Sequence, residues 1–405
     1  MKIEQIDVIT CCPGRNFVTV KIVTDSGICG WGDATVNGRE MAVVAYLEEH
    51  VAPCLIGRDP QDIEDIWQYL YKGAYWRRGP ITMAAIAGID MALWDIKGKA
   101  AGMPVYQLLG GRSRRGVSLY AHAGGSDIDQ TLSNAQDLID QGFRAVRLQS
   151  AVPGLKTTYG VVGDKKDYYE LQGNRPLPPE ESWSTQKYFQ MVEELFREAR
   201  HRLGVNVHLL HDVHSRLMPI ESAKLGKILE PYNLLFMEDA SMAENQQSYE
   251  VIRQHTTTPL AIGETYNSIW DCKDLIQNQL IDYIRVAATH SGGITAMRRI
   301  ADFASIFDVR TAPHGAPDLS PICFSTHMHL NTWVPNFGIQ EFVGLGNEQI
   351  KKVFVQDIRV ENGLAFVSEK PGLGIEFNQQ EAKKYPYKRS YLPVSRLEDG
   401  TVWNW

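Results

Sequence analysis

Three apolar runs between residues 207 and 264 each end in an acid: Val207-His208-Leu209-Leu210-His211-Asp212, Leu234-Leu235-Phe236-Met237-Glu238 and Pro259-Leu260-Ala261-Ile262-Gly263-Glu264. The three acids are 26 residues apart and then 26 again. A strand, a loop, a helix and a return loop fit that length. The spacing therefore predicts consecutive βα units of a parallel sheet.

The three acids should lie together, because residues at the carboxyl ends of neighbouring parallel strands converge at one mouth. Carboxylates that converge without a cation repel one another, so they either share protons or hold a hard cation. Mg²⁺ prefers oxygen ligands in an octahedral shell that keeps places for water or substrate. Three solvated acids at chance positions are the alternative, but equal spacing favours a metal site formed by Asp212, Glu238 and Glu264.

The composition is that of an ordinary globular enzyme. The chain has 405 residues, 44% of them hydrophobic and 22% charged, which suggests two domains or one large barrel with additions. Its net charge of −7 gives no general attraction to nucleic acid or to an anionic membrane. The six cysteines form no Cys-x-x-Cys pair, and there is no signal-peptide core or membrane-length apolar run, so we expect reduced thiols in a cytoplasmic protein.

The order of patterns predicts three parts. Strand patterns followed by three helix patterns, the last an apolar, alanine-rich run over residues 81–101, make residues 1–115 an α+β domain. From residue 117 strands and helices alternate, and eight strands up to residue 342 are the number that closes a barrel, which we assign to residues 116–345. Residues 346–405 either pack back on the first domain or extend away, and their last stretch, with Trp403 and Trp405, should not be a free tail.

A long insertion interrupts the alternation between residues 150 and 182 and contains Tyr159. Ordinary βα loops have about 2–6 residues. A loop this long at the catalytic end of a barrel is typical of a lid or a partner contact. A tolerated insertion without function is the alternative.

Ionisable residues end the predicted strands from the second onward. A purely structural barrel needs apolar layers inside and has no reason for such residues at so many strand ends. The candidates are Arg147, Asp212 with His214, Glu238, Glu264, Arg285, His314 and Glu341.

The acids at these strand ends, behind a three-strand meander and helices, resemble the pattern of the enolase superfamily. Longer motifs narrow the resemblance to the D-mannonate dehydratase family, also grouped as the D-galactonate dehydratase family, which includes members called starvation-sensing proteins. The resemblance covers essentially the whole chain. Its motifs are residues 104–111, 32–40 and 397–405, together with Cys12-Pro13-Gly14-Arg15-Asn16-Phe17-Val18-Thr19 and Gly73-Ala74-Tyr75-Trp76-Arg77-Arg78-Gly79-Pro80.

The resemblance implies an enolase-like α/β fold: an N-terminal α+β capping domain, a modified TIM (β/α)7β barrel, and a C-terminal segment, 346–405, that returns to the capping domain. It also implies a hydro-lyase with Mg²⁺ as cofactor. Mg²⁺ on Asp212, Glu238 and Glu264 binds the carboxylate of a sugar acid and stabilises the enediolate that forms when a base removes the neighbouring proton. An acid then protonates the leaving hydroxyl, and water and a 2-keto-3-deoxy acid result.

The resemblance also assigns the other site residues. Tyr159 is the base, and Arg147 favours its phenolate, since a phenol with a pKa of about 10 is otherwise a poor base at neutral pH. His214 is the general acid. The expected substrate contacts are Asn37, His122, Arg285, His314, Asp318 and Glu341.

The implied substrate is D-mannonate, which would give 2-keto-3-deoxy-D-gluconate. The stretch Arg147-Leu148-Gln149 lacks the lysine base of most enolase relatives, in agreement with the narrower family. A member that acts on another sugar acid, such as D-gluconate, or that serves as a regulatory or metabolite-binding protein, is the alternative. It is suggested by departures from the family pattern where substrate fit is decided: Val213, Ser215, Ala240 and Ala316-Pro317.

A zinc hydrolase barrel is the second enzyme class that the sequence suggests. His211, His214 and the pair His327 and His329 invite it, but such a site needs several histidines on neighbouring strands. The first strand offers only His122, and His327 falls on a predicted helix. We therefore favour Mg²⁺ and a small sugar acid, with no nucleic-acid or membrane partner, in a homo-oligomer.

Overall fold

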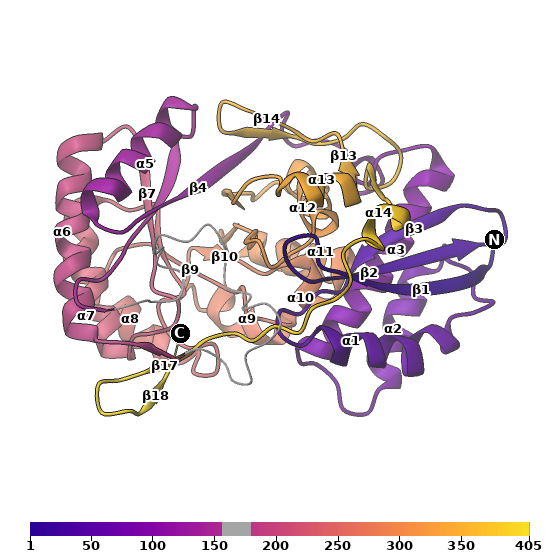
Figure 1. Cartoon of the computed structure of the whole chain (residues 1–405), viewed down its shortest axis with the longest axis horizontal. Helices are drawn as coiled ribbons and strands as arrows, with labels where there is room; N and C mark the ends of the chain where they lie inside the picture. The colour runs from indigo at the N-terminus through magenta and orange to yellow at the C-terminus, as the bar shows by residue number, and fades with distance from the viewer. Residues whose placement is uncertain (156–179, 405) are drawn as a thin grey trace.

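The computed structural model describes residues 1–155 and 180–404, which form a capping domain packed on a barrel (Figure 1). The capping domain begins with an antiparallel meander of β1 (Ile3–Cys11), β2 (Phe17–Thr24) and β3 (Cys29–Asp33). Its helices are α1 (Glu40–Tyr46), which continues as a π-helical turn over Leu47–Val51, α2 (Ile63–Gly73) and α3 (Pro80–Ala101).

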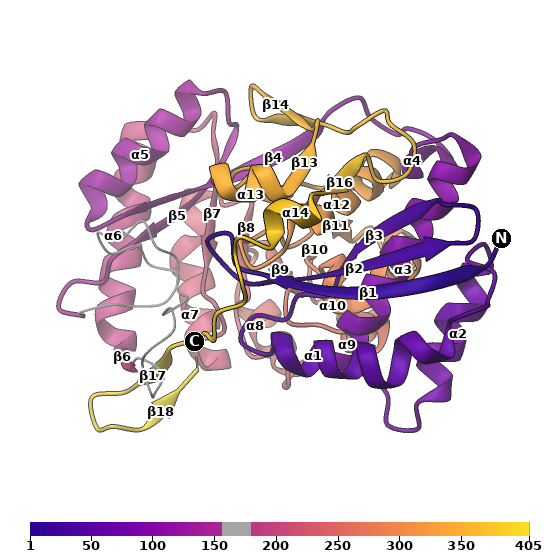
Figure 2. The same ribbon diagram turned by 45° about the vertical axis from the view of Figure 1, so that its right-hand side comes forward.

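Helix α3 is buried between the meander and the barrel, which explains its apolar, alanine-rich sequence (Figure 2). Glycines let the meander approach it closely: a Cβ on Gly32 would lie 1.8 Å from the carbonyl oxygen of Gly88. On its other side α3 contacts α10 (Ala288–Ser291) and α11 (Gly293–Ile306) of the barrel. There the Trp94 indole donates to Thr295 Oγ1 at 3.0 Å. The capping domain is thus fixed to one side of the barrel.

The barrel consists of parallel strands, and the described residues contain the eight that the sequence predicts. The first seven pair in chain order, and the eighth pairs with the first. An isolated bridge from Thr311 to Phe337, just before the eighth strand, links the seventh to the eighth. The strands are β4 (Val117–Gly125), β5 (Ala145–Ser150), β7 (His208–Asp212), β8 (Phe236–Glu238), β9 (Leu260–Ile262), β10 (Tyr283–Ile284), β11 (Arg310–Thr311) and β12 (Gln340–Phe342).

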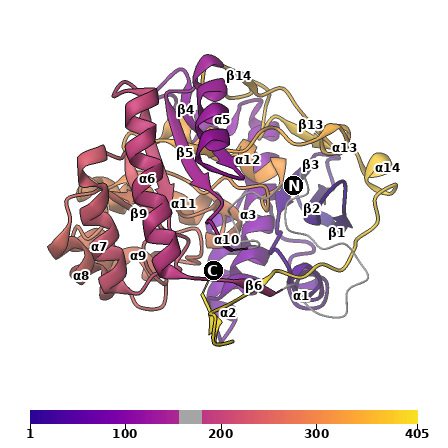
Figure 3. The same ribbon diagram turned by 60° about the vertical axis from the view of Figure 1, so that its left-hand side comes forward.

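Seven described helices alternate with these strands, and Figure 3 shows the first four along the outside of the barrel. Within the part of the chain that the structure describes, no helix is both long and apolar enough to span a bilayer. The seven are α5 (Ile128–Asp140), α6 (Thr185–Leu203), α7 (Pro219–Leu229), α8 (Ser248–His255), α9 (Ile269–Gln277), α11 and α12 (Pro321–Trp333).

One apolar layer fills the barrel interior. Each strand, or the residue next to its end, contributes one side chain, and the layer mixes aromatic rings with aliphatic side chains. The layer separates the polar mouth from the other end of the barrel. Its members are Tyr120, Ala145, Leu210, Phe236, Ala261, Tyr283, Ala312 and Ile339.

The chain after the barrel returns to the capping domain and then leaves it. Phe354 packs edge-on against Phe17 of the meander, with ring centroids 5.4 Å apart, and the Trp31 indole donates to Glu376 at 3.1 Å. The last residues cross to the barrel, where β17 (Val394–Arg396) pairs in parallel with β6 (Glu180–Ser182) and antiparallel with β18 (Val402–Trp403). The expectation that this stretch is not a free tail is confirmed for Trp403.

Candidate active site

A cavity of about 500 Å³ lies at the carboxyl ends of the barrel strands and is closed on one side by the capping domain. Asp212 and Glu238 are the last residues of β7 and β8, and Glu264 follows β9 by two residues. Both domains and the C-terminal segment line it: Arg15, Asn37 and Pro80 from the cap, Arg147, Asp212, His214, Glu264, His290, His314, Asp318 and Glu341 from the barrel, and Leu392.

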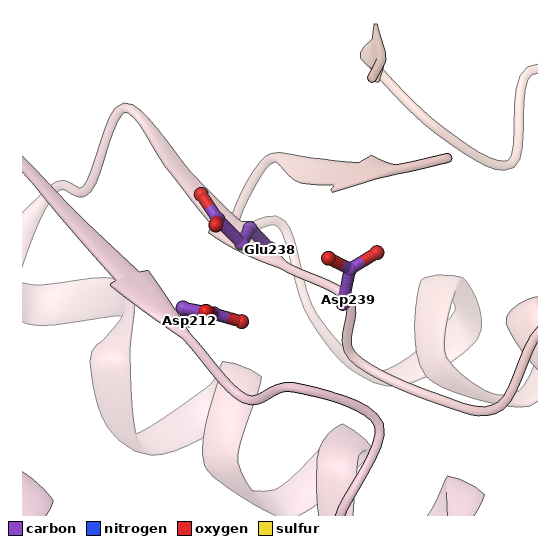
Figure 4. A group of neighbouring side chains, drawn as sticks. All are labelled: Asp212, Glu238 and Asp239. Atoms are coloured by element: carbon purple, nitrogen blue, oxygen red, sulfur yellow. The ribbon is translucent and has the colours of Figure 1, made fainter. Parts of the chain in front are cut away.

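Asp212 and Glu238 are register partners on adjacent strands and are both buried. Arg147 joins them, since its Nη1 donates to Asp212 Oδ2 and to Glu238 Oε1, each at 2.9 Å. Asp239, the next residue, adds a third carboxylate, and one oxygen of each of the three lies within 4.8 Å of the others (Figure 4). Of the described residues, this is the tightest acidic group at the mouth.

Glu264 stands beside this group rather than in it. Arg285 Nη2 bridges the two, at 3.1 Å from Glu238 Oε1 and 3.2 Å from Glu264 Oε2. The imidazole of His314 lies 3.1 Å from Glu264 Oε2, and His214 Nε2 lies 3.7 Å from Glu264 Oε1. The structure therefore brings the three predicted ligands to one mouth, with a guanidinium between the second and the third.

The pKa shifts of these carboxyl groups also separate Glu264 from the other three. Burial raises the pKa of Asp212 to about 6 and the pKa of Glu238 to about 7, and it holds the pKa of Asp239 well above its ordinary value. Burial also opposes the ionisation of Glu264, but the positive charge of His314, then of His214 and Arg285, outweighs it and holds the pKa of Glu264 below its ordinary value.

The group at Asp212 fits a hard divalent cation. Oδ1 of Asp212 and Oδ2 of Asp239 are buried and accept no hydrogen bond from any described residue, so oxygen atoms are left for a ligand. All donors are carboxylate oxygens, the type that Mg²⁺ prefers. A bound cation would also favour the ionised form of groups whose pKa burial raises.

His122, Glu341 and Arg147 connect the first, second and last strands. His122 Nδ1 lies 3.0 Å from Arg147 Nη2, and His122 Nε2 lies 2.8 Å from Glu341 Oε1. Burial, and then Arg147, lowers the pKa of His122 to about 4, so this ring is neutral at pH 7. Burial opposes ionisation of Glu341 as well, but Arg285 and His314 hold its pKa well below the ordinary value.

His314 is a cationic side chain that contacts Glu264 and Glu341. Burial favours its neutral form, but Glu264 and then Asp318 raise its pKa well above the ordinary value. Its Nε2 lies 3.2 Å from Asp318 Oδ1. Asn37 faces the same cavity from the loop after β3. All predicted substrate contacts thus line the cavity or contact residues that do.

His214 follows β7 in a turn with a positive φ of 58°. Tyr159, the predicted base, lies outside the described residues. The histidines of the zinc alternative serve other contacts: His211 contacts the Tyr188 hydroxyl at 2.6 Å and the Leu148 carbonyl at 3.0 Å, and His327 accepts from the Ala288 amide at 3.0 Å. They are buried hydrogen-bonding groups of the packed structure.

The sequence did not predict three residues of the site: Asp239 in the carboxylate group, and Arg15 and Leu392 in the cavity lining. Asp239 could have been noticed, because it directly follows Glu238. Arg15 lies in a family motif but far from any barrel strand, and no local pattern connects it to the mouth. Leu392 belongs to the C-terminal segment, and only the folded chain places it there.

Family models and known proteins agree with this fold. The mandelate racemase / muconate lactonizing enzyme N-terminal domain matches residues 6–110, and the enolase C-terminal domain-like family matches residues 130–382. The chain is 58% identical over 405 residues to a D-mannonate dehydratase of Novosphingobium aromaticivorans and equally to a D-galactonate dehydratase family member of Chromohalobacter salexigens, covering all of each chain.

A solved structure is also similar over the whole chain. It is an enolase from Pantoea ananatis with bound D-gluconate and Mg, 40% identical, with a TM-score of 0.91; the match covers 100% of this chain and 99% of that one. The chain belongs to the enolase superfamily, with the barrel and strand-end site that define that class. Within the superfamily it is a member of the D-mannonate and D-galactonate dehydratase family, and it is a hydro-lyase.

Proposed function

We propose that the chain dehydrates D-mannonate to 2-keto-3-deoxy-D-gluconate with Mg²⁺ as cofactor. The observation that carries the proposal is a buried carboxylate group beside a cavity of about 500 Å³. Asp212 and Arg147 line this cavity, and Arg147 joins Asp212 to the buried Glu238. Two relatives that bear the name D-mannonate dehydratase are 58% identical to the chain over its full length. The Pantoea ananatis structure with D-gluconate and Mg supports the same cofactor and ligand class.

Asp212, Glu238 and Glu264 would hold the Mg²⁺, which supplies positive charge that stabilises the charge developing on the substrate carboxylate. Asp239 would add a further negative charge beside the cation, since one of its oxygens lies within 4.8 Å of an oxygen of Asp212. In this proposal Arg285, His314 and Glu341 form a hydrogen-bonded wall that orients the acid. Asn37 and Asp318 contact its hydroxyl groups.

Tyr159 takes the proton next to the carboxylate, and Arg147 favours the phenolate that this requires. His214 gives its proton to the hydroxyl on carbon 3, which leaves as water. The resulting enol becomes the 2-keto-3-deoxy acid. The base and the acid are thus different residues. Nε2 of His214 lies 3.7 Å from Oε1 of Glu264, at the edge of the carboxylate group.

A screen of C5 and C6 sugar acids with Mg²⁺, with 2-keto-3-deoxy product as the readout, tests the proposal. We expect turnover of D-mannonate that stops when the metal is chelated and returns when Mg²⁺ is added. If only D-gluconate gives product, D-mannonate is not the substrate, but the proposed dehydration reaction still holds. No product from any acid, with binding still measurable, would favour a regulatory or metabolite-binding role.

A further inference from the structure

The turn that presents His214 is sterically unfavourable. His214 and Ser215 both have left-handed backbone conformations, with φ of 58° and 59°. Side chains other than glycine rarely adopt this conformation, and it persists where surrounding contacts hold it. The position of His214 therefore depends on what holds residues 213–216.

One side of the turn is held by the chain that continues from β8. The Val213 amide donates to the Glu238 carbonyl at 3.0 Å, and the Ser215 amide donates to the Asp239 carbonyl at 2.7 Å. The Ser215 hydroxyl donates to the Ser241 carbonyl at 3.3 Å. These contacts belong to the barrel and couple the turn to the proposed metal ligands.

The other side is held by the C-terminal hairpin of β17 and β18. The indole Nε1 of Trp403 donates to the carbonyl oxygen of Arg216 at 2.8 Å. The guanidinium of Arg216 lies over the ring of Trp183, 5.3 Å from its centroid, and both side chains are 1% exposed. Arg216 is thus held at its backbone by one tryptophan and at its side chain by another.

The hairpin is itself well anchored. Its strand β17 pairs with β6, and the Trp183 amide, just after β6, donates to the Arg396 carbonyl at 2.8 Å. An ion pair joins Arg396 to Glu180 at 2.8 Å, and another joins Lys187 to Glu398 at 3.2 Å. Trp403 therefore reaches the turn from a fixed support, although 187 residues separate it from Arg216.

We propose that Trp403 is a positioning residue, whose hydrogen bond to the Arg216 carbonyl fixes the His214 turn in the geometry that proton donation to the leaving hydroxyl requires. The inference rests on the proposed role of His214 as the general acid. A general acid must be within hydrogen-bond reach of the group that it protonates, and a misplacement of about 1 Å can lower a rate about 100-fold.

The variant Trp403→Phe tests this, because it keeps an aromatic ring and removes the donor. Trp270→Phe is the matched control, since Trp270 lies on the outer helix α9 and is 57% exposed. We expect Trp403→Phe to lower kcat for dehydration at least about tenfold, with KM and Mg²⁺ affinity within about twofold of the parent. An unchanged kcat would overturn the proposal, and so would a lower kcat that comes with a higher KM and a weaker Mg²⁺ affinity.

A second readout needs no substrate, so it separates this proposal from the proposed function. Diethyl pyrocarbonate labels histidines. A tryptic peptide spanning residues 203–216 contains three of them: the exposed His208, the buried His211 and the half-buried His214. Labelling of His214 relative to His208, measured by fragment-ion mass spectrometry, should rise several-fold in Trp403→Phe and stay unchanged in Trp270→Phe. Equal labelling in both variants would show that Trp403 does not hold the turn, whether or not the enzyme dehydrates any acid.

Discussion

Glu238 is the residue on which the proposed metal site depends most. It is fully buried, and it contacts Arg147, Arg285 and the hydroxyl of Tyr120. Replacing it with Gln removes a negative charge and leaves two guanidinium groups beside a neutral amide. Even residues that only support a ligand change metal affinity about 10–100-fold, so a lost ligand should cost at least that.

We therefore expect Glu238→Gln to weaken Mg²⁺ binding more than about 10-fold in calorimetric titration. Glu361→Gln, an exposed substitution in β14 (Arg359–Glu361), is the control and should bind Mg²⁺ as the parent does. Equal affinity in the two variants would contradict the assignment of the metal to this group.

The acid and the base can be separated by isotope exchange. Tyr159→Phe should abolish both dehydration and exchange of the substrate α-hydrogen with deuterated solvent, because no proton is removed. His214→Asn should lower dehydration about 10²–10⁴-fold, the usual contribution of a general acid. Proton NMR of a turned-over acid in D₂O measures both. Exchange that persists without Tyr159 would move the base to His214 or His314.

Asp239 is a residue of the carboxylate group that the sequence did not predict. The equal spacing predicted the convergence of Asp212, Glu238 and Glu264 at one mouth, because strand period fixes where a strand-end residue points. Asp239 is beyond the strand, with φ of 44°, and a backbone turn directs its carboxylate back to Asp212. No periodic rule covers such a turn. The strand pattern predicted Arg285 at the mouth, but not that its guanidinium lies between Glu238 and Glu264.

Among the elements, the contact of β3 with α3 depends on glycines. A methyl group on Gly32 would overlap the Gly88 carbonyl, so the strand and the helix would have to separate. Overpacking of this kind usually costs about 1–3 kcal/mol. We expect Gly32→Ala to lower the free energy of unfolding by at least that amount in a denaturant titration. Gly73→Ala, at the end of α2 with open space around it, should be neutral or slightly stabilising.

The contact of α3 with α11 should depend on pH through Asp90. Burial, opposed by hydrogen bonds from Thr295, raises the pKa of Asp90 from 3.8 to about 7. The native state therefore binds this proton more tightly than the unfolded chain. The stabilisation is complete below pH 3.8 and is lost as pH rises through about 7, with a slope of at most about 1.4 kcal/mol per pH unit.

The substitution Asp90→Asn should remove this part of the pH dependence, because an amide resembles the protonated acid and does not ionise. Denaturant unfolding at several pH values between 4 and 8 measures the difference between parent and variant. Asp7→Asn, at a half-buried position of β1, should keep the slope of the parent. A parent and an Asp90 variant with parallel profiles would show that Asp90 does not titrate in this range.

Long periodic elements were predictable and short or distant ones were not. The apolar run at 81–101 predicted α3 to within one residue at its start, because burial on all sides leaves a strong signal. β6, β17 and β18 have two or three residues each, and β6 and β17 pair across more than 200 residues of sequence, so their pattern appears only in the folded chain. The same distance hid Leu392 from the sequence reasoning.

At the scale of the whole molecule, the site is shared between domains with different tasks. The barrel supplies the carboxylates and histidines, and the cap supplies Asn37 and Arg15. We expect Asn37→Ala to raise KM about 2–10-fold, the effect of one hydrogen bond, with Mg²⁺ affinity unchanged. Steady-state kinetics and calorimetry on the same preparation measure the two. A loss of metal affinity would show that the cap is part of the metal site.

The return of the C-terminal segment to the meander has a consequence for synthesis on the ribosome. Phe17 and Trp31 leave the exit tunnel early, but Phe354 and Phe377, which cover them, are made more than 300 residues later. At about 5–20 residues per second, the outer face of the meander stays uncovered for at least about 15 seconds, unless a chaperone shields it. Nascent chains stalled before residue 377 should therefore be captured by holdase chaperones, and chains released after residue 377 should not.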